Sequence, residues 1–287
     1  MLKHKISKGL RRILFTLKCR KSKQTSNIYH CCFQKTATQW FRMLFSDKIF
    51  LNKTGFPLYT PGENFITEDR TVLQELHHIP RGVIVSPFYI TAKNFAAHTA
   101  NTDYRAFYIT RDPRDVIISS YFSLRYSHAT SNAYIETRRK ELAELSEHDG
   151  IMKTIRELAR FISEIMLQWK QAENDRVRIF AFEDVFGPSQ EAVLAAIMQH
   201  CRLPLAPEDI RNLADRYAFD RISGRRQGEE DRQNHYRKGI SGDWLNYFSD
   251  AHKGTFKQQA GELINDEITL KIYLGLVYAS DLKSNYP

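Results

Sequence analysis

The stretch from Tyr29 to Trp40 constrains the fold most, because it passes from a buried strand through a short polar loop into a helix. Residues 27–33 are mostly apolar, and an apolar helical face continues over residues 40–45. A lysine and several small or hydroxyl-bearing residues lie at the junction. Backbone N–H groups, hydroxyl donors and a positive charge at a helix N-terminus form an anion site. The sequence therefore predicts an anionic ligand here.

The rest of the chain repeats this alternation of short strands and helices. We expect strands at residues 27–33, 83–86, 104–110 and 176–182. We expect helices at residues 40–45, 71–78, 116–122, 134–172, 188–200, 207–217 and 255–265, with a loop over 50–70. Pro87 should end the second strand, because proline lacks the N–H that a sheet requires. This order predicts an α/β fold, a central parallel sheet with helices on both faces, whose ligands bind beyond the carboxyl ends of the strands.

The positive charge of the chain is concentrated at its beginning. The net charge is +9, from 42 Lys and Arg against 33 Asp and Glu. Residues 1–23 contain many basic and no acidic side chains, so the remainder is almost neutral. We therefore expect no nucleic-acid partner, a flexible basic leader over residues 1–26 and a single domain over residues 27–287. A peripheral contact of this leader with a membrane surface is the alternative to a solvated tail.

Cysteine usage and hydropathy suggest a cytoplasmic protein. The four cysteines, Cys19, Cys31, Cys32 and Cys201, show no C-x-x-C spacing. Cys31 and Cys32 are neighbours in a strand and point to opposite faces, which makes them poor joint metal ligands. We expect reduced, buried thiols and no bound metal. No segment is apolar for long enough to cross a bilayer, so we expect no transmembrane helix.

The pair Lys35-Thr36 also occurs at the end of a Walker P-loop, which binds nucleoside triphosphates. That loop needs glycines so that its backbone can wrap the phosphates. None of residues 27–34 is glycine, and no acidic strand end is available for magnesium. A Walker-type NTPase is therefore excluded.

Three segments together resemble a different nucleotide-using family. They are F-Q-K-T-A-T-Q-W at 33–40, R-D-P-R-D-V-I-I-S at 111–119 and R-K-G-I-S-G-D-W at 237–244. Their order and spacing resemble the sulfotransferases that use 3′-phosphoadenosine 5′-phosphosulfate (PAPS). In that family the first segment binds the 5′-phosphosulfate, the second binds the 3′-phosphate and the third closes over the nucleotide. The resemblance spans about residues 27 to 250 and implies the sulfotransferase fold, a P-loop-like phosphosulfate site, PAPS as sulfate donor and no metal.

The resemblance implies a role for each residue of the first segment. Lys35 would lie beside the bridging oxygen of the donor and carry the chemistry. Residues of the loop would hold the 5′-phosphate, namely Thr36, Ala37, Thr38 and Gln39. Trp40 would stack near the adenine, although a core aromatic residue is the alternative. Ala37 stands where the family usually has glycine, so we expect it to keep a negative φ.

The other two segments would bind the far end of the nucleotide. By resemblance, Arg111 and Ser119 would contact the 3′-phosphate; the alternative for Arg111 is a surface ion pair with Asp112 or Asp115. A second grip on this phosphate would come from Arg237, Lys238 and Gly239, for which a solvated charge run is the alternative. Phe182 and Phe219 match aromatic positions of the family near the adenine.

The general base is the weakest part of the match. Cytosolic members have a histidine after a short strand, whereas residues 85–89 contain none. We name His98 as the candidate base, since it lies on an expected helix beyond this strand. Other candidates are His77, His78, His128, Glu63, Glu68 and Asp69.

We therefore expect a sulfotransferase that moves a sulfuryl group from PAPS to a hydroxyl or amine of a small-molecule or carbohydrate acceptor. The polar and aromatic residues in segments 50–70, 85–102 and 220–235 favour a sugar or other polar alcohol. The alternative is a non-catalytic nucleotide-binding protein on the same fold. The dimerisation motif of cytosolic members is absent after residue 244, which leaves the oligomeric state open.

Overall fold

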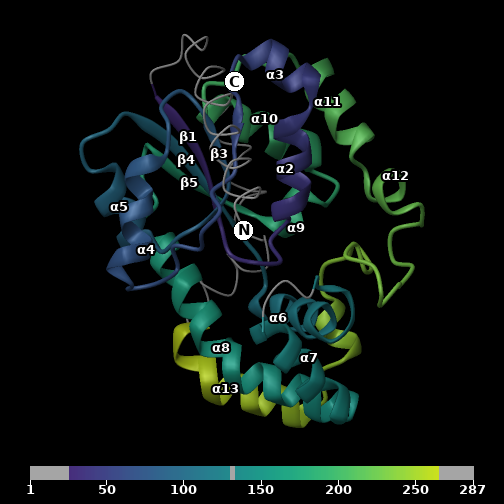
Figure 1. The fold of residues 1–287 in the computed structure, drawn as a ribbon. Coiled ribbons are helices and arrows are strands. Elements are labelled where there is room, and N and C mark those ends of the chain that lie inside the picture. Colours follow the sequence, from purple (N-terminus) through teal and green to yellow (C-terminus); the bar gives the residue numbers. More distant parts are fainter. Residues whose placement is uncertain (1–25, 130–132, 265–287) are drawn as a thin grey trace, which may run out of the picture.

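The computed structural model describes residues 26–129 and 133–264, and a five-stranded parallel sheet lies at its centre (Figure 1). The strand order is β2–β3–β1–β4–β5. The strands are β1 (Asn27–Cys32), β2 (Leu58–Tyr59), β3 (Ile84–Tyr89), β4 (Tyr104–Thr110) and β5 (Val177–Ala181). This arrangement confirms the expected α/β architecture. Cys19 and, except for Ser26, the expected leader lie outside the described residues.

Helices cover both faces of the sheet, as Figure 1 shows. One face carries α2 (Thr38–Ser46), α3 (Lys48–Thr54), α10 (Gln190–His200) and α11 (Pro207–Arg216). The other face carries α5 (Ala92–Thr99), α6 (Pro113–Phe122), α8 (Glu147–Gln171) and α13 (Asp250–Ile264). The remaining helical segments are α4 (Arg70–Gln74), η1 (Glu75–His78), η2 (Ser123–Ser127), α7 (Ala133–Glu144), α9 (Phe182–Val185), α12 (Phe219–Ser223) and η3 (Asp243–Asn246).

The strands divide their side chains between two hydrophobic cores. In β4, Ala106 and Tyr108 belong to the core beneath α6 and α8, while Phe107 and Ile109 belong to the core beneath α2 and α10. This alternation is the period of a strand that is buried on both faces. It explains why the strands read as nearly continuous apolar runs.

Strand β3 differs from the expectation, because Pro87 does not end it. The strand runs through Ile84–Tyr89. Its register with β1 shifts between the pairs Tyr29–Val85 and Cys31–Phe88, so β3 has one more residue than β1 across this interval. Such a bulge leaves one position outside the hydrogen-bond ladder, and a bulge is a position where sheets tolerate proline. The extended strand carries Tyr89 to the carboxyl edge of the sheet.

Two elements lie where a loop was expected over residues 50–70. The helix α3 ends at Thr54 with Gly55 in the left-handed conformation, and the two-residue strand β2 pairs with β3. The cysteines of the described residues, Cys31, Cys32 and Cys201, are buried thiols. Within the described ranges, no helix is long and apolar enough to cross a membrane.

Candidate functional site

A cavity of about 330 Å³ opens at the carboxyl edge of the sheet, where the loops after β1, β4 and β5 meet. Its volume lies within the range of small-molecule sites. Segments distant in the sequence line it, with Lys35 after β1, Tyr89 at the end of β3 and Arg111 after β4. The cavity is thus located where open parallel sheets bind their ligands.

The loop between β1 and α2 has an unusual backbone. Lys35 and Ala37 have φ angles of 66° and 65°, in the left-handed region. The expectation that Ala37 keeps a negative φ is therefore wrong, because the chain makes this turn without the glycine that usually makes it. Left-handed residues in such turns bring successive N–H groups into a concave, anion-binding array. The buried hydroxyl of Thr36 donates to the carbonyl of Phe33 at 2.8 Å, so this hydroxyl braces the loop.

The Lys35 ammonium is the most perturbed cation of the cavity. Its pKa is lowered from 10.5 to about 8, first by burial and then by the positive charges of Arg111 and Arg237. Burial and the two positive charges both disfavour the charged amine. An anion bound between Lys35, Arg111 and Arg237 would offset the repulsion among their charges. The cavity therefore concentrates positive charge around Lys35.

Arg111 links this loop to the other parts of the cavity. Its guanidinium donates to the carbonyl oxygens of Lys35 at 2.9 Å and Ile240 at 3.4 Å. It lies 4.1 Å from the centroid of the Phe182 ring and 3.8 Å from the Asp115 carboxylate. With an exposed fraction of 8%, Arg111 is buried in the site and does not form a surface ion pair. Its alignment between two backbone segments keeps the guanidinium directed along the cavity wall.

Glu183 lies behind this arginine and supports the start of α6. Its carboxylate accepts the N–H of Asp112, the N-cap residue of α6, at 3.1 Å. Burial raises the pKa of Glu183 to about 7, although the nearby charge of Arg111 acts in the opposite direction. The buried Glu183 carboxyl group, which directly follows β5, therefore connects the end of β5 to the start of α6.

Residues 235–247, which we call the closing segment, complete the cavity from above the sheet edge. The Asp115 carboxylate on α6 accepts the N–H groups of Gly242 at 2.7 Å and Trp244 at 3.0 Å. Gly239 has a φ of 70°, and a Cβ there would lie 2.3 Å from the Phe219 ring. This glycine lets the segment pass directly over an aromatic wall of the cavity.

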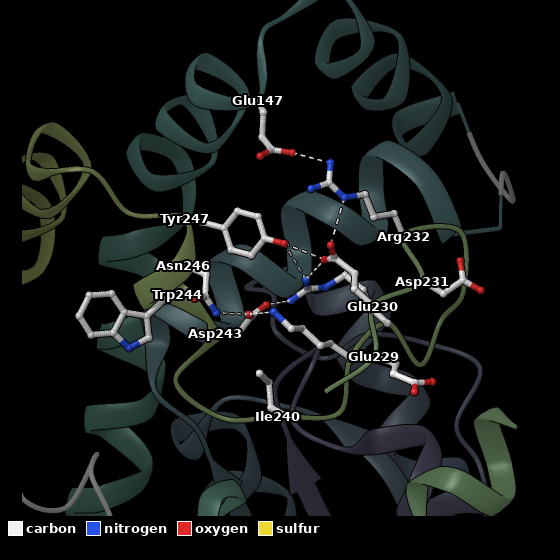
Figure 2. Close-up of polar contacts among 12 residues, drawn as sticks. Glu147, Glu229, Glu230, Asp231, Arg232, Ile240, Asp243, Trp244, Asn246 and Tyr247 are labelled. Carbon is white, nitrogen blue, oxygen red and sulfur yellow. Dashed lines mark hydrogen bonds and ion pairs between the residues drawn. The ribbon is translucent and has the colours of Figure 1, made fainter. Parts of the chain in front are cut away.

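The cations of the closing segment are paired within a network of charged side chains (Figure 2). The Asp243 carboxylate accepts hydrogen bonds from Arg237 and, at 2.6 Å, from Lys238. Glu230 accepts from Arg237 and from the Tyr247 hydroxyl. Although burial opposes the shift, the hydrogen bonds of Lys238 and Arg237 lower the pKa of Asp243. These cations are therefore fixed in position and do not form a solvated charge run.

The cavity also has an aromatic wall. It consists of Trp40, Phe182, Phe186 and Phe219. The Trp40 indole is buried and donates to the carbonyl of Tyr217 at 2.8 Å, so the residue serves the core and the cavity at once. Flat apolar side chains with few polar atoms fit the face of a purine base.

The cavity brings together most of the residues that the sequence singled out. They are Lys35, Ala37, Thr38, Gln39, Trp40, Arg111, Ser119, Phe182, Phe219, Arg237, Lys238 and Gly239. Thr36 is in the same loop, but its side chain does not line the cavity.

His98, the expected base, lies elsewhere. Its Nε2 is 3.1 Å from the hydroxyl of Tyr29, a core residue on the α8 side of the sheet. Burial, and then the charge of His77, lowers the pKa of His98 to about 4. The helical pattern of α5 located His98 on a helix but did not determine which side of the sheet that helix covers.

Several lining residues had no role in the sequence-based site: Gln34, Tyr89, Phe186, Ile222, His235, Tyr236 and Ile240. His128, one of the candidate bases named beside His98, also lines the cavity. His235 and Tyr236 directly precede Arg237, so their position in the sequence was a usable signal. His128 lies after α6, and only the folded chain brings it to the cavity. Among the described residues, no cluster of three or more His, Cys, Asp or Glu side chains could hold a metal ion.

Comparisons with known proteins point to one family. A family model described as "Sulfotransferase domain" matches residues 21–266. The structure resembles mouse sulfotransferase SULT7A1 complexed with PAP, with a TM-score of 0.64, 16% identity and coverage of 89% of each chain. It also resembles retinol dehydratase in complex with androsterone and the inactive cofactor PAP, with a TM-score of 0.54, 18% identity and coverage of 86% and 83%. A search of curated proteins finds no match.

Proposed function

The chain belongs to the sulfotransferase domain family, and on that basis we propose that it transfers a sulfuryl group from PAPS to a hydroxyl group of a small-molecule or carbohydrate acceptor. The two structural relatives contain PAP (3′-phosphoadenosine 5′-phosphate), which is the product that PAPS leaves after transfer. The donor is a nucleotide with anionic groups at two positions of its ribose. Such a donor fits a site that has a cationic region for each anionic group and an aromatic surface for the adenine.

The observation that carries this proposal is the arrangement of Lys35 and Arg111 in one cavity. The Arg111 guanidinium donates to the Lys35 carbonyl at 2.9 Å, so the two charged groups belong to a single unit. Lys35 and the N–H groups of its loop suit the 5′-phosphosulfate. Arg111, Ser119 and Arg237 suit the 3′-phosphate, for which arginine provides charge-assisted paired hydrogen bonds.

Lys35 is the residue that we assign to catalysis. Sulfuryl transfer requires in-line positioning and stabilisation of the negative charge that develops on the leaving phosphate oxygen. A lysine ammonium at the start of α2 provides both a positive charge and a hydrogen-bond donor for that oxygen. Burial, and then the neighbouring charges of Arg111 and Arg237, lower the pKa of Lys35, so an anion that binds beside the amine stabilises its charged form.

The lining residues near Lys35 favour a polar acceptor. Tyr89, Tyr236, His128 and His235 share the cavity with Lys35 and carry hydrogen-bonding groups. Hydroxyl-rich ligands need such donors and acceptors to replace their water contacts. We therefore propose a sugar or another polar alcohol as the acceptor.

A radiolabelled transfer assay tests this function. Sulfate-labelled PAPS is incubated with monosaccharides, oligosaccharides, aliphatic alcohols, sterols and phenols, and labelled products are separated. Lys35→Ala should lower transfer at least about 100-fold, the scale of a lost charge-stabilising group. Lys93→Ala is the matched control, because Lys93 is an exposed lysine on α5 that pairs with the exposed Glu68. Equal transfer by the wild type and Lys35→Ala would contradict the mechanism.

The alternative is a protein that binds the nucleotide without catalysis. It predicts tight PAP binding by calorimetry and no transfer to any acceptor of the panel. Transfer above the rate of the Lys35→Ala variant would exclude this alternative.

A further inference from the structure

Two histidine side chains line the cavity. Among its described lining residues there is no aspartate or glutamate, and the two imidazoles are those of His128 and His235. Tyr89 occupies the end of β3, where burial raises its pKa to about 12, so its phenol keeps its proton. Thr38 forms a hydrogen bond with the Tyr89 side chain. A base that deprotonates an acceptor hydroxyl must therefore come from another element.

His128 is held in a defined position by the turn that precedes it. The π-helical segment η2 continues directly from α6, and the His128 N–H donates to the Ser123 carbonyl at 2.7 Å. From α7, Arg139 donates to the carbonyls of Leu124 at 3.2 Å and of His128 itself. π-Helical turns are rare overall, and they often occur at functional sites. Here the turn directs a histidine to the cavity that α6 also supplies with Ser119.

The hydrogen bond of the His128 ring determines its tautomer. Nδ1 lies 2.9 Å from the carbonyl oxygen of Ala129. A carbonyl oxygen only accepts, so Nδ1 must carry the hydrogen. In the neutral ring, Nε2 then keeps its lone pair, which is the form a proton acceptor requires.

His235 is electrostatically less suited to the same role. Desolvation, and then the positive charges of Lys35 and His128, lowers the pKa of His235 to about 4. It precedes Arg237 in the closing segment and lies within the field of Lys35. Lys35, Arg111, Arg237 and Lys238 line the same cavity as His128, and Arg139 donates to the His128 carbonyl.

We propose that Nε2 of His128 is the general base that deprotonates the acceptor hydroxyl, an inference that rests on the proposed sulfotransferase function. Nε2 accepts the hydroxyl proton while the acceptor oxygen forms a bond to sulfur. The bond between sulfur and the 5′-phosphate oxygen breaks, and its electron pair stays on the phosphate beside Lys35. The products are a sulfate ester, PAP and an imidazolium, which returns its proton to water.

The first test needs no acceptor. In the full chain with ¹⁵N-labelled histidine and bound PAP, His128 is assigned by comparison with His128→Gln. The proposal predicts a neutral Nδ1–H tautomer near pH 8. A ring that carries its hydrogen on Nε2 under these conditions would overturn the proposal, because that nitrogen would have no lone pair for the acceptor.

The second test measures PAPS turnover in a set of variants. Turnover is measured with water as the acceptor, which is the basal reaction, and with any acceptor of the panel that gives a product. His128→Gln should lower kcat about 100-fold or more, the usual contribution of a general base, and remove the fall in rate at low pH. His235→Gln should keep that low-pH fall. His78→Gln is the control, an exposed histidine outside the cavity. A low-pH fall that disappears in His235→Gln and persists in His128→Gln would assign the base to His235.

PAP binding distinguishes a wrong general base from a wrong proposed function. If His128→Gln binds PAP within about threefold of the wild type and loses turnover, the fold and donor site are intact. Partial recovery of the rate by added imidazole in His128→Ala supports the role directly. Unchanged turnover in His128→Gln would overturn this inference alone, whereas a wild type that does not bind PAP would overturn the proposed function.

Discussion

Ala37 is the residue at which this chain departs most clearly from a glycine-based phosphate loop. It is the N-cap of α2, it makes no side-chain capping bond, and its φ is 65°. An L-residue in the left-handed region is destabilised by about 1–2 kcal/mol. The fold keeps this conformation because β1 and α2 fix the two ends of the loop.

Ala37→Gly should therefore stabilise the protein. We expect the free energy of unfolding to rise by about 1 kcal/mol, measured by denaturant titration. Ala96→Gly is the matched control, because Ala96 is exposed within α5, where glycine should destabilise by about 1 kcal/mol. A destabilised Ala37→Gly variant would show that the loop is not strained at this position.

Lys35 makes a second prediction at this scale. Its pKa is about 8 in the folded chain and 10.5 for an ordinary lysine, so at pH 8.5 much of the amine is neutral. Bound PAP would raise this pKa, and the amine would take up a proton on binding. Below pH 7 the amine is already charged and uptake should vanish.

Calorimetry of PAP binding at pH 8.5, in two buffers of different ionisation enthalpy, measures this proton uptake. The phosphates of PAP contribute little, since their second ionisation occurs at a pKa of about 6. Lys35→Met should abolish the uptake and Lys93→Met should not. Equal uptake in wild type and Lys35→Met would assign the proton to another group.

At the scale of elements, the closing segment depends on a close passage over Phe219. A Cβ at Gly239 would lie 2.3 Å from the Phe219 ring, whereas a Cβ at Gly228 would meet nothing within 4 Å. Both glycines have positive φ, of 70° and 96°. Alanine substitutions at Gly239 and Gly228 therefore distinguish the effect of steric displacement of the closing segment from the effect of backbone strain.

We expect Gly239→Ala to weaken PAP binding by about tenfold or more, through displacement of Arg237 and Lys238, and Gly228→Ala to leave it within about threefold. A tenfold loss corresponds to about 1.4 kcal/mol. Binding is measured by calorimetry and stability by denaturant unfolding. Equal losses of affinity in both variants would mean that strain, and not the contact with Phe219, controls the segment.

The sequence predicted elements well where a local pattern determined them. β4 has the bounds expected from its uninterrupted apolar run, Tyr104–Thr110. β2 was missed, because its two residues form a strand only through pairing with β3. β3 was predicted too short, because the bulge opposite β1 that accommodates Pro87 is a property of two strands together.

At the scale of the whole molecule, the cavity residues also divide into those that a local pattern predicts and those that only the folded chain brings together. Lys35 and Arg111 follow their strands directly, so a parallel sheet alone brings them to one edge. His98 and His128 lie beyond an intervening helix or turn, and their final positions depend on helix packing. Sequence order therefore predicted the cavity residues that directly follow strands, whereas the position of His128 at the cavity could be identified only from the fold.

The central claim is that one cavity recognises phosphates at two positions of a nucleotide. Calorimetric titration of the full chain with PAP and with adenosine 5′-phosphate, which lacks the 3′-phosphate, tests it most directly. The account predicts that PAP binds about 100-fold more tightly or better, a difference of about 2.7 kcal/mol, and that Arg111→Ala removes most of this difference. Equal affinity for the two nucleotides would contradict the account.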